Sequence, residues 1–257
     1  MNAAAWKKFL KIKNYFKNYV EELSVSLPFL KDIQQELING KSDKKIPSYV
    51  VETPVVYNTA LDDIKAEDEI KMILVADNPG RREQAAENRR YLVGPSGKIA
   101  AKFFKDNPSL GIDFNKNVII LNKTPIHSPR TVDLGKLILK ENVLIKNNGI
   151  NNITIKKAVE ESQKVMASIL YDFHEALDCP VWITGYSEMK KNKIFEIYTE
   201  ELKKQYKNNK EKLFIYRHFS MNQFTIDLKK QALPGETIKK TLKRIGIAYR
   251  HRILGNN

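Results

Sequence analysis

Four short apolar runs recur along the 257-residue chain. They begin at Met72, Val118, Val181 and Leu213, and they are rich in β-branched or aromatic residues. Such runs are too short for buried helices, and nearly continuous apolarity is typical of parallel strands covered on both faces. The pattern therefore predicts a central four-stranded parallel sheet.

Segments with helical spacing separate these runs. Apolar residues from Ile155 to Phe173 recur as on one face of a long helix, and shorter helical patterns occupy residues 99–104 and 194–202. Strands that alternate with helices form βαβ units, whose crossovers place helices on both faces of a sheet. We expect an α/β fold, a three-layer α/β/α sandwich.

The two ends of the chain carry further helical patterns. Between Trp6 and Val20, apolar residues recur on one side and lysines on the other. We therefore expect residues 1–45 to form a helical N-terminal extension that packs against the core. A helix followed by a short strand is expected from residue 236 onward. No repeat or convincing linker divides the chain, so we expect a single domain over residues 1–257, with the chemistry in residues 70–223.

The charge of the chain favours a polyanionic partner. Lys and Arg number 44 against 30 Asp and Glu, a formal net charge of +14. A solvated lysine-rich surface is the alternative explanation. The single cysteine, Cys179, excludes an intrachain disulfide and any four-cysteine metal or iron–sulfur site. With no apolar run long enough to span a bilayer and no stretch typical of a signal peptide, we expect a soluble cytoplasmic protein. We also expect a monomer, and the sequence suggests no metal or cofactor.

Polar side chains follow three of the four predicted strands. Asp77 and Asn78 come after the first strand, Asn122 ends the second, and His218 follows the fourth. The carboxyl ends of parallel strands meet at one edge of a sheet, so we expect these side chains to converge there. Each also has an ordinary structural explanation, because Asp and Asn before Pro-Gly are typical of turns.

These segments resemble, in order, the motifs of the uracil-DNA glycosylase superfamily. Residues 76–80, Ala-Asp-Asn-Pro-Gly, look like its first motif, and residues 89–97 resemble a segment of its iron–sulfur members. Residues 118–122 are similar to the strand whose terminal Asn reads the edge of uracil. Residues 218–220 resemble the His-Pro-Ser motif that closes the active site. The lone cysteine means that the iron–sulfur cluster is absent.

The resemblance implies a monofunctional DNA-repair glycosylase. Such an enzyme flips a damaged base, here most simply uracil, out of DNA and hydrolyses its N-glycosidic bond. Asn78 would orient the attacking water, and Asp77 is a second candidate for the water or the sugar cation. Asn122 would read N3–H and O4 of the base, and His218 would donate a hydrogen bond to O2 as negative charge develops there.

The same resemblance implies further contacts to the base and to DNA. Leu92 aligns with the aromatic residue that stacks on the base, Tyr91 lies one residue earlier, and Gly80 would allow close approach. Phe219 replaces the usual proline, and Met221 falls where an apolar wedge enters DNA. The side chains expected to contact DNA are those of Arg81, Arg89, Arg90, Lys98, Lys123, Ser220, Met221 and Asn222.

Other functions remain open at this stage. The chain can be a weakly active or inactive member of the superfamily that binds nucleic acid, because the segment after His218 departs from the family pattern. It can also act on another deaminated base. A different α/β enzyme of nucleotides is the third alternative, although neither glycine-rich phosphate loop of such enzymes is present.

Overall fold

The computed structural model describes residues 1–40, 47–139, 154–208 and 210–255. Within them lie four strands, β1 (Met72–Ala76), β2 (Val118–Asn122), β3 (Val181–Ile183) and β4 (Leu213–Ile215). All pair in parallel, in the order β2-β1-β3-β4. The predicted four-stranded parallel sheet is confirmed.

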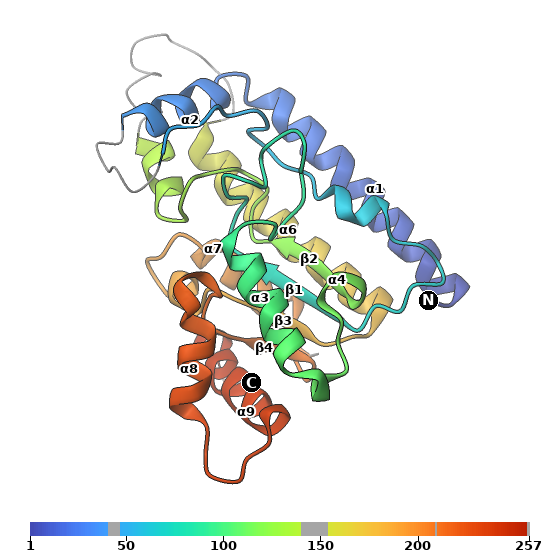
Figure 1. Cartoon of the computed structure of the whole chain (residues 1–257). Helices are drawn as coiled ribbons and strands as arrows, with labels where there is room; N and C mark the ends of the chain where they lie inside the picture. Colours follow the sequence, from blue (N-terminus) through green and yellow to red (C-terminus); the bar gives the residue numbers. More distant parts are fainter. Residues whose placement is uncertain (41–46, 140–153, 209, 256–257) are drawn as a thin grey trace.

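Helices cover both faces of the sheet (Figure 1). On one face lies α6 (Ile155–Leu177), which packs against α1 (Ala3–Ser26) and α7 (Glu196–Gln205). On the other face lie α3 (Pro95–Asp106), α8 (Gln223–Gln231) and α9 (Ile238–Leu254). The predicted α/β/α sandwich is therefore confirmed, and its helices take the βαβ positions that the spacing indicated.

Aromatic side chains fill the layer between the sheet and α3, α8 and α9. The ring centroid of Trp182 in β3 lies 5.5 Å from that of Phe104 in α3 and 4.9 Å from that of Tyr216, just after β4. Phe224 in α8 lies 6.0 Å from the same tryptophan. Such offset and tilted pairs add to the free energy gained by burying large apolar area. The first turn of α8, and the loop that precedes it, are thereby fixed against the sheet.

The N-terminal helices are built into the core. Helix α1 buries one face that includes Phe9, whose ring centroid lies 5.5 Å from that of Phe173 in α6. Helix α2 (Leu30–Asn39) buries Gln34, whose amide donates to the carbonyl oxygens of Pro54 at 3.0 Å and His127 at 2.8 Å. The predicted N-terminal helical segment is confirmed, and it reaches the loop that follows β2.

The prediction of a strand near the C-terminus is wrong. Helix α9 continues to Leu254, because its buried residues Ile245, Tyr249 and Ile253 keep a four-residue spacing. Shorter helical segments include η1 (Thr59–Asp62), η2 (Pro108–Leu110), α4 (Phe114–Asn117), η3 (Tyr186–Met189) and η4 (Ser220–Asn222). In the part of the chain that the structure describes, no helix is long and apolar enough to cross a membrane.

Candidate active site at the strand ends

The register of the sheet brings the polar strand ends together. Ala76 at the end of β1 pairs with Asn122 at the end of β2. The backbone N–H of Lys123 then donates to the carbonyl oxygens of Ala76 at 3.1 Å and Asp77 at 3.0 Å. His218 is close enough to Asp77 and Lys123 for both charges to act on its pKa. Asp77, Asn122 and His218 therefore lie at the same edge of the sheet.

A buried ion pair lies at the centre of this edge. Lys123 Nζ is 2.5 Å from Asp77 Oδ1 and donates to the Thr184 carbonyl oxygen at 2.5 Å. Thr131 donates its hydroxyl to Asp77 Oδ2 at 3.0 Å. Gly185 has φ +86°, and a Cβ added there would lie 2.2 Å from Asp77 Oδ1, so only glycine leaves room for the pair.

The ion pair corrects the assignment of Lys123 to DNA contact. Its side chain is 0% exposed, and its ammonium group is bonded to Asp77 and to backbone carbonyl oxygens. It therefore cannot reach a phosphate. Burial lowers the pKa of Lys123, and the neighbouring carboxylate of Asp77 opposes that shift. A lysine beside a strand-end Asn looks like a surface cation in sequence, and only the fold shows that it points inward.

The imidazole of His218 is held in one orientation. Its Nδ1 accepts a hydrogen bond from the backbone N–H of Ser220 at 2.9 Å. A neutral ring that accepts at Nδ1 carries its proton on Nε2, which is then a donor. Burial lowers the pKa of His218, the charge of Asp77 opposes the shift, and Lys123 adds to it. The ring is thus a neutral hydrogen-bond donor. The contact of Ser220 with it is made by the backbone N–H and not by the side chain.

Asn78 has its amide nitrogen fully engaged. Nδ2 donates to the hydroxyl of Ser128 at 2.9 Å and to the carbonyl oxygens of Ser128 at 3.2 Å and Pro79 at 3.3 Å. Among the described residues none donates to Asn78 Oδ1, which leaves that oxygen to accept from water. Both oxygens of Asp77 already accept hydrogen bonds, so the geometry favours Asn78 over Asp77 for holding a water.

Asn122 is buried without hydrogen-bonding partners. It is 1% exposed, and neither Nδ2 nor Oδ1 makes a hydrogen bond to the described residues. A buried carboxamide left unpaired costs about 1–3 kcal/mol, so native proteins usually pair one with protein, ordered water or a ligand. Both atoms of Asn122 are therefore available to read a ligand edge that offers one donor and one acceptor.

Glu83 is a site residue that was not predicted from the sequence. The residue is 7% exposed, and its carboxyl accepts from the backbone N–H of Gly80 at 3.3 Å, while the N–H of Leu92 is close enough to favour the carboxylate. Burial raises the pKa of Glu83 to about 7, and the N–H groups and the Asn122 carboxamide oppose the shift. The Asn122 contact does not meet hydrogen-bond geometry but is close enough to favour the carboxylate. A glutamate within a stretch of arginines gives no sequence signal of burial.

Tyr91 and Leu92 differ in their roles. The Tyr91 hydroxyl donates to the Val56 carbonyl oxygen at 2.6 Å, and its N–H donates to Asn58 Oδ1 at 3.2 Å. These bonds anchor Tyr91 in the fold, so we withdraw it as the base-stacking residue. Leu92 is buried at φ +55°, and its carbonyl sits so close to Gly97 that a Cβ there would clash at 1.4 Å. Leu92 remains the candidate wall of the base site.

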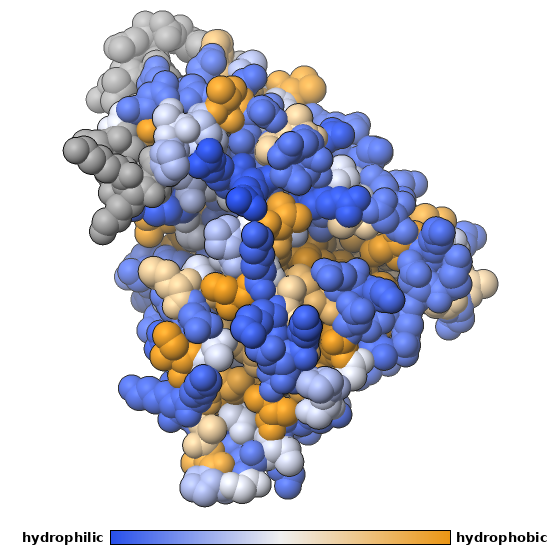
Figure 2. Space-filling model, in the orientation of Figure 1, coloured by the Kyte–Doolittle hydropathy of each residue, from blue (hydrophilic) through white to orange (hydrophobic). Residues whose placement is uncertain are grey.

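The predicted backbone-binding cations lie on the loop between β1 and α3 and on α3 itself. Arg81, Arg89, Arg90 and Lys98 are all exposed, and strongly hydrophilic side chains gather over this region in Figure 2. The Arg81 guanidinium lies 5.1 Å above the ring of Tyr49, while Arg90 pairs with an exposed aspartate at 2.5 Å. Gly80 has no atoms within 4 Å of an added Cβ, so the protein itself does not require glycine there.

The loop after His218 presents one apolar side chain to solvent. Met221 is 78% exposed at φ +50°, and Asn222 follows at φ +59°. Phe219 is 1% exposed and its ring stacks on Phe224 at 4.3 Å, so it belongs to the core. Two consecutive non-glycine residues in the left-handed region are strained and persist only where the surrounding structure holds them. Of the two apolar residues, only Met221 is exposed to solvent.

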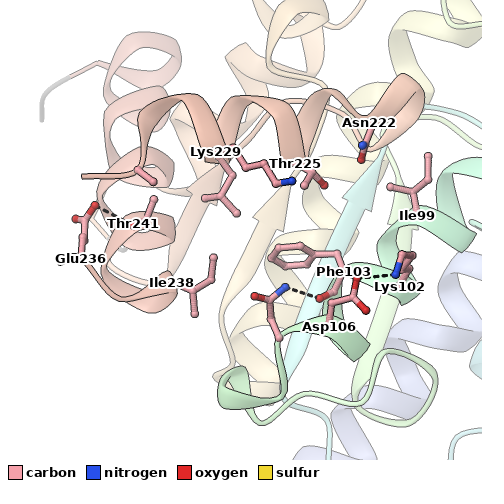
Figure 3. A pocket seen from close by; sticks show the side chains of 13 residues that line it. Ile99, Lys102, Phe103, Asp106, Asn222, Thr225, Lys229, Glu236, Ile238 and Thr241 are labelled. Carbon is pink, nitrogen blue, oxygen red and sulfur yellow. Dashed lines mark hydrogen bonds and ion pairs between the residues drawn. The ribbon is translucent and has the colours of Figure 1, made fainter. Parts of the chain in front are cut away.

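A groove of about 720 Å³ begins beside this loop (Figure 3). Asn222 and Thr225 face Ile99 and Lys102 across it. Its carboxylates are paired with cations, Asp106 with Lys102 at 2.8 Å and Glu236 with an arginine at 2.7 Å. The groove therefore adds no catalytic group to the site.

The described residues contain no cluster of three or more His, Cys, Asp or Glu side chains that could hold a metal ion. The polar groups at this edge of the sheet are two carboxamides, an imidazole, two carboxyls and the ammonium of Lys123. No family model matches this chain, and no curated protein or solved structure shows significant similarity to it.

Proposed function

We propose that this protein is a DNA glycosylase that flips uracil out of DNA and hydrolyses its N-glycosidic bond. The observation that carries the proposal is the neutral His218, fixed as an Nε2 donor at the same strand-end edge as Asn78 and Asn122. This set matches the demands of the reaction, which must stabilise a departing base anion and direct a water to the sugar. The motif order described above supports the same function.

The reaction begins with heterolysis of the bond between the sugar C1′ and the base N1. Both bonding electrons leave with the base, and the negative charge spreads onto O2, where His218 Nε2–H donates. A neutral donor suits this step, because it needs no proton transfer to stabilise the anion. Burial, which lowers the pKa of His218, keeps the ring in that state.

Water then attacks the oxocarbenium-like sugar. Asn78 cannot act as a general base, but its free Oδ1 can accept a hydrogen bond from the water and orient an oxygen lone pair toward C1′. Because the sugar cation is a strong electrophile, the water can lose its proton to solvent after the new C–O bond forms. The products are an abasic site and free uracil.

DNA would approach across the β1–α3 loop. The exposed Arg81, Arg89 and Lys98 would contact phosphates on either side of the lesion, and Met221 would fill the space that the flipped base leaves. This arrangement uses the surface cations for affinity and the buried strand ends for chemistry.

Excision from labelled oligonucleotides tests the proposal. Wild type, His218→Ala and the exposed-histidine control His251→Ala are assayed on uracil opposite guanine, opposite adenine and unpaired. We expect uracil release by wild type and by the control, and a loss of about 10²–10³-fold in His218→Ala. No release in any context by wild type, or an equal rate in His218→Ala, would contradict the proposal.

One observation favours a second function, the binding of nucleic acid without base excision. Asn122 and Leu92 are both covered, at 1% and 7% exposed, so the base-reading group is closed off in this conformation. DNA binding that weakens steeply with salt, without release of uracil, would favour this function.

A further inference from the structure

Glu83 contacts three segments that the proposed function assigns to the base. Its carboxyl accepts from the N–H of Gly80 in the first segment at 3.3 Å, and the N–H of Leu92 in the second segment and the Asn122 carboxamide of the third are close enough to act on its pKa. It is 7% exposed, and Asn122 is 1% exposed with both amide atoms unpaired. A carboxylate can only accept hydrogen bonds, so beside the amide it favours the orientation that turns Nδ2 toward it.

A carboxamide can face a base in two orientations. With Nδ2 turned to Glu83, the amide presents its second N–H and its Oδ1 in the order that matches O4 and N3–H of uracil. Cytosine offers an amino donor and the N3 acceptor instead, and it requires the flipped amide. The flip would turn Asn122 Oδ1 toward the Glu83 carboxylate and place two acceptors face to face, with no proton between them.

We infer that Glu83 is a positioning residue that sets base selectivity, holding Asn122 in the orientation that accepts uracil and rejects cytosine. The inference rests on the proposed function for the identity of the base site. It assigns the ligand class as bases that pair a carbonyl acceptor with a ring N–H donor. Glu83 itself need not touch the base.

Binding of uncleavable oligonucleotides tests this inference apart from catalysis. Each single strand carries one 2′-fluoro-deoxyuridine or 2′-fluoro-deoxycytidine among adenines, and dissociation constants are measured for wild type, Glu83→Gln and the exposed control Glu87→Gln. The glutamine at position 83 can donate to a flipped Asn122. We expect the preference for uracil over cytosine to fall by at least about tenfold in Glu83→Gln and to remain in Glu87→Gln.

The outcomes separate this inference from the proposed function. A folded Glu83→Gln with wild-type preference would overturn the inference, as would a wild type that binds both strands equally. If wild type prefers uracil and Glu83→Gln loses that preference, the inference is supported. If the excision assay then shows no base release, the glycosylase function is contradicted while the inference still holds.

A pH series on wild type keeps the test decisive if Glu83→Gln does not fold. Glu83 takes up a proton as the pH falls through about 7, and the acid can then donate to a flipped amide. Its titratable neighbour Tyr91 has its pKa raised far above neutral by burial and stays uncharged. The preference for uracil should therefore decline below this pH, and a preference that is flat with pH would contradict the inference.

Discussion

At the scale of single residues, the site contains two buried carboxyls that lie in different electrostatic environments. Asp77 is neutralised by Lys123, which is itself 0% exposed, and the pair occupies the space that Gly185 leaves free. Glu83 has backbone N–H groups and the Asn122 amide near its carboxyl, and burial raises its pKa to about 7. Asp77 thus stabilises the fold as one half of an ion pair, whereas Glu83 can gain or lose a proton near neutral pH.

Removing Lys123 should destabilise the fold strongly. Lys123→Met leaves Asp77 buried without its cation, and breaking such a pair costs about 3–5 kcal/mol in the free energy of unfolding. The double variant with Asp77→Asn should recover most of this loss, since no unpaired charge remains. Urea denaturation measures the effect, with the exposed Lys98→Met as the control. A loss below about 1 kcal/mol in Lys123→Met would contradict the ion-pair account.

Glu83 should make stability depend on pH. Its pKa is 4.5 in the unfolded chain and about 7 in the fold, so its contribution to stability is full below 4.5 and is lost as the pH rises through 7. The free-energy difference between wild type and Glu83→Gln should change by up to about 3 kcal/mol across this window, in favour of the variant at high pH. Urea titrations at several pH values measure it, and a constant difference would contradict the raised pKa.

At the scale of elements, the loop from His218 to α8 serves two functions. The backbone N–H of Ser220 fixes the imidazole, and the strained turn that follows lifts Met221 to 78% exposed. The stack of Phe219 on Phe224 anchors the loop to the first turn of α8. The donor and the apolar wedge candidate are therefore held in one rigid segment.

Shortening the wedge should affect duplex DNA selectively. Met221→Ala removes the apolar bulk that fills the vacated stack, so uracil excision from duplex should fall by about tenfold or more while excision from single strands changes little. The matched control is Ile226→Ala, an exposed apolar residue on α8. Equal losses on both substrates would show that Met221 supports the fold and does not act as a wedge.

At the scale of the whole molecule, the net charge of +14 should make DNA affinity depend on salt. Each phosphate contact contributes about 0.9 to the slope of the logarithm of the binding constant against the logarithm of salt. Charge removal in Arg81→Gln or Arg89→Gln should reduce this slope by about one contact each. Lys8→Gln on α1 should leave it unchanged. An unchanged slope in both loop variants would indicate that DNA binds to another face of the protein.

The architecture was largely predictable from the sequence, and the detailed site was not. Strand apolarity and helix spacing are local signals, so the parallel sheet and the sequence of strands and helices along the chain follow from them. The position of Asn78, Asn122 and His218 after or at the ends of strands follows as well. The inward turn of Lys123 and the burial of Glu83 depend on packing between distant segments, which residue type does not reveal. The anchoring of Tyr91 by Val56 and Asn58 is long-range in the same way.

Release of free uracil from a single-stranded oligonucleotide by wild-type protein, in the presence of a metal chelator, tests the central claim most directly. Mass spectrometry detects the free base, and alkaline cleavage of the strand detects the abasic site. We predict equal amounts of both products, with release unaffected by the chelator. A strand that stays intact under alkali, with no free base after long incubation at saturating protein, would contradict the glycosylase.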